Sequence, residues 1–332
     1  MIISIFKTNH IAVYFYLVLY AFLLRGFFLY HPVMVEVPGN SLAGKFLYQN
    51  IALQKWSAFL PQLADILLTI AEAIFLNFIL TINGLFDRQT FVPAMVFITF
   101  SSLFPQWIAY DVATIASLFI LLSLYNLFRL ADKDLSRNNI FFTSLYIGLA
   151  SLFYFPATLF ILIILIGLLT RSYIVRDFLL IAIGFVLPFY FIGIWFYYQG
   201  GLQNYIGLLF SVFKERYTLF YINTPQLIFL LFIFVLSITG FLIWFSGPGY
   251  KVIRQRRLMN LFIFYFIIAL FATPAVNSDK IVYLKALMMP ASVFAARFFD
   301  AAKLRFYHHI LFALLLAGIL FFQLIFFGVF KV

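Results

Sequence analysis

Acidic residues are scarce in this sequence, with 11 Asp and Glu among 332 residues, so those placed to do chemistry stand out. Glu36 follows the first long apolar stretch, and Asp111 separates two later ones. We expect both carboxylates at the outer face of a membrane, where a lipid-linked substrate could meet an acceptor. Helix capping is the alternative for Asp111, because a carboxylate before a helix favours its N-terminal dipole, and loop solvation is the alternative for Glu36.

Basic residues in segments expected on the same side are candidate ligands for a lipid phosphate or pyrophosphate, because ammonium and guanidinium groups donate strong hydrogen bonds to phosphate oxygens. These residues are Lys214, Arg216, Lys280 and Lys285. Anionic lipid headgroups would be bound equally well. A second basic cluster, residues 251–257, is expected on the opposite side as a topology anchor on an anionic leaflet.

Arg25, Asp65 and Glu72 lie within apolar stretches, where charge is costly and marks a functional hypothesis. Arg25 lies toward the outer end of the first stretch, and Asp65 and Glu72 lie on one face of the second, about 10 Å apart along a helix. We expect Arg25 to form an intramembrane ion pair with one of these carboxylates. A catalytic or transport role is the alternative, because two carboxylates near one arginine also resemble an ion-coupled carrier.

The sequence lacks the residues that several kinds of site require. The chain has no cysteine, so disulfides, thiolate metal sites and cysteine nucleophiles are excluded. Its four histidines, His10, His31, His308 and His309, form no ligand-spaced set, and we expect no histidine metal site. Whether a divalent cation binds as a cofactor stays open.

The composition requires a membrane. Hydrophobic residues make up 65% of the chain, aromatic residues 22% and charged residues only 10%, whereas soluble domains are about 25% charged. A cytosolic enzyme is therefore excluded. The formal net charge of +11 is better explained by membrane topology than by nucleic acid, and we expect no nucleic-acid partner.

Charges, Pro, Gly and Asn divide the sequence into about eleven apolar segments, each close to the length that crosses a bilayer as a helix. The segments are 11–30, 64–84, 91–108, 112–130, 140–155, 156–171, 178–198, 225–246, 260–275, 284–300 and 309–330. The sequence therefore predicts an all-α, polytopic transmembrane bundle. With the N-terminus in the cytoplasm, basic residues concentrate inside, as in known membrane proteins, provided that 140–171 forms a hairpin and not one kinked helix.

The two longest outer segments are expected to hold amphipathic helices. In 31–63, Leu42, Phe46, Leu53, Trp56 and Leu60 share one helical face, which predicts a helix lying in the membrane interface. The segment 199–224 could also lie flat on the membrane. Without tandem repeats or low-complexity linkers, residues 1–332 are predicted to form a single integral membrane domain.

Three stretches resemble the GT-C superfamily of polytopic membrane glycosyltransferases. Residues 146–158, YIGLASLFYFPAT, with the apolar half that follows to Arg171, resemble the short central hairpin of that family. Residues 176–201 resemble the family's next helix, which leaves a basic turn and ends in an aromatic-Gly segment. Residues 281–297 are similar to its "RYLLP…P…AA" segment. The likeness implies a GT-C-like core in 1–200 and variable C-terminal helices in 201–332.

The resemblance also implies an activity. Such enzymes transfer sugar from a polyprenyl-phosphate donor and use an acid in the first outer loop, often with a second acid in the next. These positions fall on Glu36 and Asp111, where a carboxylate could deprotonate the acceptor hydroxyl or bind a divalent ion. The family usually shows Asp or Asp-Glu in the first loop, whereas here Glu36 is alone.

Three functions follow as expectations. The first is a glycosyltransferase at the outer face of a bacterial inner membrane, whose partners are membrane lipids and a polyprenyl-phosphate-linked sugar. The second is a non-catalytic GT-C-like scaffold subunit that binds other inner-membrane proteins in an envelope assembly or secretion complex. The third is a carrier of a lipid-linked or ionic substrate, which would expose Asp65 and Glu72 to water.

Overall fold

The computed structural model describes residues 2–31, 59–86, 88–108, 112–130, 137–168, 175–214, 223–246, 253–272, 284–300 and 306–328. These residues are helical with short turns and include no strand, which confirms the all-α prediction. The helices in chain order are α1 (Ile2–Phe6), α2 (Ala12–Arg25), the 3-10 helix η1 (Gly26–Leu29), α4 (Phe59–Ile82), α5 (Val92–Ser101), α6 (Pro105–Ile108), α7 (Val112–Leu130), α8 (Arg137–Phe153), the 3-10 helix η3 (Phe155–Phe160), α9 (Ile161–Leu168), α10 (Val175–Tyr198), α11 (Leu202–Lys214), α12 (Thr224–Ser246), α13 (Ile253–Ala272), α14 (Lys285–Phe299) and α15 (Phe306–Phe326).

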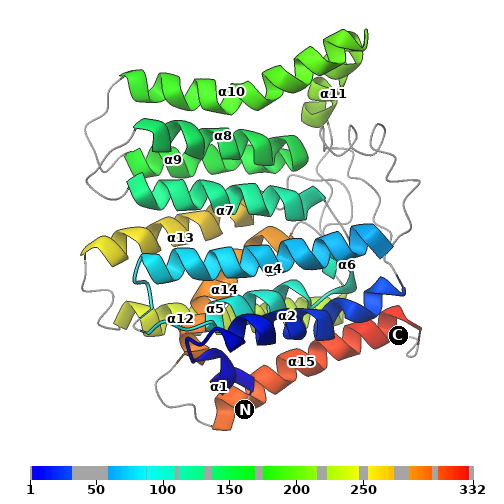
Figure 1. Ribbon diagram of the computed structural model, residues 1–332, viewed down its shortest axis with the longest axis vertical. Coiled ribbons are helices and arrows are strands. Elements are labelled where there is room, and N and C mark those ends of the chain that lie inside the picture. The colour runs from blue at the N-terminus through cyan, green and yellow to red at the C-terminus, as the bar shows by residue number, and fades with distance from the viewer. Residues whose placement is uncertain are drawn as a thin grey trace.

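The long helices run side by side in alternating directions (Figure 1). From α10 at one edge, contacts lead through α8 to α7 and α4, and from α4 through α5 to α14 and α12. Helices α2 and α15 complete the opposite edge. Apolar chains form such bundles in a bilayer because a helix satisfies its backbone hydrogen bonds internally, where no water is present to do so.

Among the residues that the structure describes, seven stretches are long and apolar enough to cross a membrane: α2 continued by η1, α4, α7, α10, α12, α13 and α15. The other four predicted segments also contain helices, but shorter ones. These are α5 with α6, α8, η3 with α9, and α14. In the predicted hairpin, α8 and α9 contact each other and lie alongside one another, as expected for a chain that folds back.

Three predicted boundaries need correction. The segment 91–108 is not one helix, because α5 ends at Ser101 and α6 begins at Pro105. Helix α4 begins at Phe59, so Leu60 belongs to it and not to the interfacial helix expected in 31–63. The other four residues of the expected apolar face lie outside the described ranges. Helix α13 begins at Ile253 rather than 260, so Arg254, Arg256 and Arg257 of the second basic cluster lie in its first turns.

Burial distinguishes the central helices from the peripheral ones. All ten residues of α5 are buried, as are nearly all of α14, so protein surrounds both helices. In α10 the buried residues are Ile181, Gly184 and Pro188, and most of its apolar surface faces outward. Because apolar side chains are compatible with lipid, this exposure agrees with a position at the membrane-facing edge of the bundle.

Candidate functional site

The guanidinium group of Arg25 lies at the centre of a buried polar network. Its Nη1 donates to Asp65 Oδ2 at 2.8 Å and to Thr69 Oγ1 at 2.6 Å. Its Nε donates to Ser102 Oγ at 2.8 Å, and its Nη2 donates to the carbonyl oxygen of Ser101 at 2.7 Å and to Ser101 Oγ at 2.9 Å. The five bonds match the five N–H donors of an arginine. The break after α5 makes this possible, because the last carbonyls of a helix have no partner within it.

Asp65 joins Arg25 to a second cation, Lys285. Its Oδ1 accepts a hydrogen bond from Thr114 Oγ1 at 2.9 Å and lies 3.4 Å from Lys285 Nζ. Lys285 Nζ also donates to Thr114 Oγ1 at 2.6 Å and to the carbonyl oxygen of Trp107 at 2.8 Å. We call Arg25, Asp65 and Lys285 the ion-pair cluster. It connects α2, α4 and α14 directly, and through its neutral partners it also holds α5, α6 and α7.

Glu72 lies two turns further along α4 and does not join the ion pair. The Ser117 hydroxyl donates to its Oε1, while its Oε2 has no hydrogen-bond partner within the described residues. Asp65 and Glu72 are both fully buried. A carrier that uses them would need water to reach both carboxylates, which this conformation does not provide.

The predicted site residues lie in different surroundings in the structure. Arg25 and Asp65 form the expected intramembrane pair, at 2.8 Å and with both side chains 0% exposed. Lys285 was expected as a phosphate ligand at the outer face. In the structure its side chain is buried, and its three donors bind protein atoms. Lys214 is the last residue of α11. Glu36, Asp111, Arg216 and Lys280 lie outside the described residues.

The ion-pair cluster lies at one end of the bundle, which we call the cluster end. Helix α2 finishes there, whereas α4, α7 and α14 begin there (Figure 1). Each of these helices contributes its charged or polar side chain within two turns of that terminus. The cluster is therefore close to a face of the bundle although its members are enclosed by protein.

Sequence reasoning missed the neutral part of the network. Thr69, Ser101, Ser102 and Thr114 lie in apolar segments, where hydroxyl groups often bind their own helix backbone. Trp107 contributes its backbone carbonyl oxygen, for which no side-chain signal exists in the sequence. One sequence feature could have indicated these residues: in several apolar segments, a Ser or Thr lies at the same depth in the membrane as a charged residue of another segment. Within the described residues, no group of three acidic or histidine side chains could hold a metal ion.

The fold and this network define a polytopic helical membrane protein with a buried charged cluster near one membrane face. Compared with protein-family models, curated proteins and solved structures, the chain matches none of them.

Proposed function

We propose that this protein is a membrane glycosyltransferase of GT-C-like fold. It transfers a sugar from a polyprenyl-phosphate donor to an acceptor at the outer face of a bacterial inner membrane. One observation carries the proposal: the segments that contain the candidate acids and cations all connect to helices at the cluster end (Figure 1). These segments are 32–58 with Glu36, 109–111 with Asp111, 215–222 with Arg216, and 273–283 with Lys280.

The connection that carries Asp111 is anchored on both sides, which supports a catalytic role. On its N-terminal side, Lys285 donates to the carbonyl of Trp107, and the buried Gln62 donates to that of Ile108. On its C-terminal side, Thr114 is held by Asp65 and Lys285. Fixed flanks are what a catalytic carboxylate needs, because a loosely held group loses the geometry of the reaction.

The proposed reaction uses each group in one role. A carboxylate, Glu36 or Asp111, accepts the proton of the acceptor hydroxyl, whose oxygen then bonds to the anomeric carbon of the donor sugar. The bond from that carbon to the phosphate oxygen breaks, and polyprenyl phosphate leaves with the bonding electrons. Lys214, Arg216 and Lys280 are proposed to stabilise the departing phosphate. Lys285 is instead a positioning residue, because its donors hold the flanks of Asp111.

Charge distribution supports an N-terminus in the cytoplasm. The described cations at the end opposite to the cluster are Lys7, Arg88, Arg129, Arg137, Arg176, Arg254, Arg256, Arg257 and Arg297. Those at the cluster end are Arg25, Lys214 and Lys285, two of which are buried. Cytoplasmic faces of membrane proteins carry the excess of Lys and Arg, so the cluster end is proposed to be external.

Eleven crossings are proposed for the whole bundle. The seven long stretches would be joined by α5 with α6, α8, η3 with α9, and α14. Protein encloses α5 and α14, so neither needs the length or the uniform apolarity of a helix that contacts lipid. Residues 1–200 would form the GT-C-like core and 201–332 the variable C-terminal helices.

The test is sugar transfer in proteoliposomes. Purified protein would be given undecaprenyl-phosphate glucose or mannose together with a hydroxyl acceptor such as a short oligosaccharide, and release of undecaprenyl phosphate would be measured. Of Glu36→Gln and Asp111→Asn, the one that removes the general base should lower the rate about 100-fold or more, the usual contribution of such a group. The matched control is Asp177→Asn, which removes a half-buried carboxylate in the first turn of α10, at the opposite end, and should not change the rate. Transfer that survives both outer-face substitutions would contradict the assignment.

A further inference from the structure

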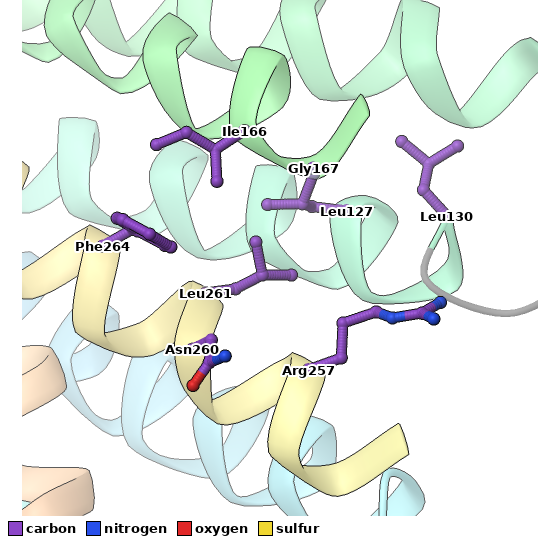
Figure 2. Close-up of a pocket in the computed structure, with 8 residues that line it drawn as sticks. All are labelled: Leu127, Leu130, Ile166, Gly167, Arg257, Asn260, Leu261 and Phe264. Atoms are coloured by element: carbon purple, nitrogen blue, oxygen red, sulfur yellow. The ribbon is translucent and has the colours of Figure 1, made fainter. Parts of the chain in front are cut away.

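A pocket opens between α7, α9 and α13 at the end of the bundle opposite to the ion-pair cluster. Figure 2 shows its lining, which includes Leu127 from α7, Ile166 and Gly167 from α9, and Arg257 and Phe264 from α13. Its volume is about 100 Å³. Soluble metabolites and drug-sized ligands occupy pockets of roughly 300–1,000 Å³, so this one is too small to enclose such a molecule.

The lining changes from polar to apolar along α13. Arg257 and Asn260 come first, followed by Leu261 and Phe264, over about 10 Å of helix. Asn260 and Phe264 are exposed, so the pocket opens sideways toward the surrounding bilayer. From the membrane face inward, the lining presents a charged group, then a polar group and then apolar surface. A phospholipid has the same order, with a charged phosphate, polar ester groups and apolar acyl chains. The small volume suits the start of one acyl chain, with the rest of the lipid in the bilayer.

A glycine keeps the apolar part of the pocket open. A Cβ atom on Gly167 would lie 3.1 Å from Leu127 Cδ1, and both residues line the pocket. Any larger side chain at this position would compete for the same space. Gly167 therefore offers a way to fill the pocket without changing its charge.

The charge at this end selects an anion. Arg254 and Arg256 lie in the same first turns of α13 as Arg257, and Arg129 lies near the end of α7, beside Leu130 of the pocket lining. The described acids at this end, Asp177 and Asp300, do not line the pocket. Basic pockets between membrane helices on the cytoplasmic side are suited to anionic lipid headgroups.

We propose that this pocket binds an anionic glycerophospholipid of the adjacent leaflet. The phosphate accepts hydrogen bonds from Arg257 and Asn260, and the first methylene groups of one acyl chain pack against Leu261, Phe264 and Leu127. The site does not depend on the proposed transferase activity, because it lies at the other end of the bundle. Either assignment can fail without the other.

Native mass spectrometry of the full chain tests the proposal, with phosphatidylglycerol and phosphatidylcholine of identical acyl chains supplied in equal amounts in detergent. The wild type should retain phosphatidylglycerol in preference to phosphatidylcholine. Arg257→Ala should lower retained phosphatidylglycerol about tenfold, since a hydrogen bond to a charged group is lost. Asn260→Leu should lower it several-fold, and because Asn260 is exposed, this variant should keep its fold. Gly167→Phe should reduce retention of both lipids.

The matched control is Arg256→Ala. Arg256 is exposed, lies beside Arg257 in sequence and does not line the pocket, so its loss should leave phosphatidylglycerol retention unchanged. Equal losses in Arg256→Ala and Arg257→Ala would overturn the proposal and indicate nonspecific attraction to a basic face. So would equal retention of the two lipids by the wild type, or displacement of the lipid by millimolar inorganic phosphate.

Discussion

Arg25 and Asp65, 40 residues apart in sequence, form an ion pair of 2.8 Å in which neither side chain is exposed. The carboxylate of Asp65 also lies 3.4 Å from the Lys285 ammonium, so one acid serves two buried cations. Desolvation makes buried charges expensive unless their partners compensate for the lost water. Among the three charged residues of the ion-pair cluster, Asp65 should therefore contribute most to the stability of the fold at the cluster end.

Asp65→Asn should strongly destabilise the fold. The substitution keeps the shape of the side chain but leaves Arg25 and Lys285 buried without a counter-charge, which costs about 3–5 kcal/mol when one partner of a buried pair is removed. Unfolding in a single detergent, followed by circular dichroism against temperature or denaturant, measures the loss.

Glu72→Gln is the matched control on the same helix. Because Glu72 has one hydrogen-bond partner among the described residues, Ser117, its loss should cost at most about 1 kcal/mol. Similar losses in the two variants would contradict the account.

Lys285→Met should have an intermediate effect. Asp65 keeps its bonds from Arg25 and Thr114, while the carbonyl of Trp107 loses a donor, so we expect a loss of about 1–3 kcal/mol. Combined with Asp65→Asn, the substitution should recover part of the loss, because one uncompensated cation is removed. A double-mutant cycle measures this coupling. If Lys285→Met kept full stability but lost phosphate-lipid binding, Lys285 would be the outer ligand that the sequence suggested.

The sequence was sufficient to predict helices in all eleven apolar segments, because a long apolar run at the length of a membrane span has few other solutions. It could not predict where they break. The gap between Ser101 and Pro105 lies inside a continuous apolar run, and the hydrogen bonds from Arg25 that use this gap come from a distant segment. The early start of α13 at Ile253 was missed for the opposite reason, since charged residues were taken to end a helix although long basic side chains can extend to the interface.

Gly240→Ala should push α12 away from α14 and destabilise the fold. A Cβ atom at Gly240 of α12 would lie 1.9 Å from the carbonyl oxygen of Phe294 in α14, and nearby Ser237 Oγ donates to the carbonyl of Ala291 at 3.1 Å. Small residues allow membrane helices to approach this closely. The added methyl group should cost about 1–3 kcal/mol in the same unfolding assay.

The control for this substitution is Gly207→Ala in α11. A Cβ atom there meets nothing within 4 Å, so the change should be neutral or stabilise by up to about 1 kcal/mol through reduced backbone freedom. If both glycine variants behave alike, close packing of α12 on α14 is not what Gly240 provides.

Tyr205 should make the docking of α11 sensitive to alkaline pH. Its hydroxyl donates to the carbonyl oxygen of Phe189 at 2.8 Å, and burial raises the pKa of the Tyr205 phenol above its ordinary value. The Tyr205 phenol therefore loses its proton at a lower pH when α11 is undocked than when it is docked. Docking is fully stable below pH of about 10 and weakens as the pH rises through the pKa of the docked phenol. Because the chain has no cysteine, a dye on Gln203→Cys reports this motion by anisotropy between pH 8 and about 11.5.

Tyr205→Phe should abolish the alkaline transition, because no ionisable hydroxyl remains, and should weaken docking at neutral pH by about 1 kcal/mol. Tyr198→Phe, at an exposed position near the end of α10, should leave the transition unchanged. An identical transition in Tyr205→Phe would assign it to another group.

The candidate site was predictable only in part. The cost of charge in a membrane was enough to pair Arg25 with an acid, but the sequence could not choose between Asp65 and Glu72, which share a helical face. The structure decides it, because Thr114 and Lys285 both bind Asp65, whereas within the described part of the chain Ser117 alone binds Glu72. Lys285 was assigned to the outer face because it begins an apolar segment, and its interior partners belong to α4, α6 and α7, far away in sequence.

Intact-particle mass spectrometry after purification in mild detergent tests the central claim most directly. A transferase should arrive without stoichiometric partner proteins and should carry a polyprenyl-phosphate lipid, whose retention falls when Lys214, Arg216 and Lys280 are replaced by Gln. Stoichiometric partner proteins without such a lipid would contradict the transferase and make the protein a scaffold subunit.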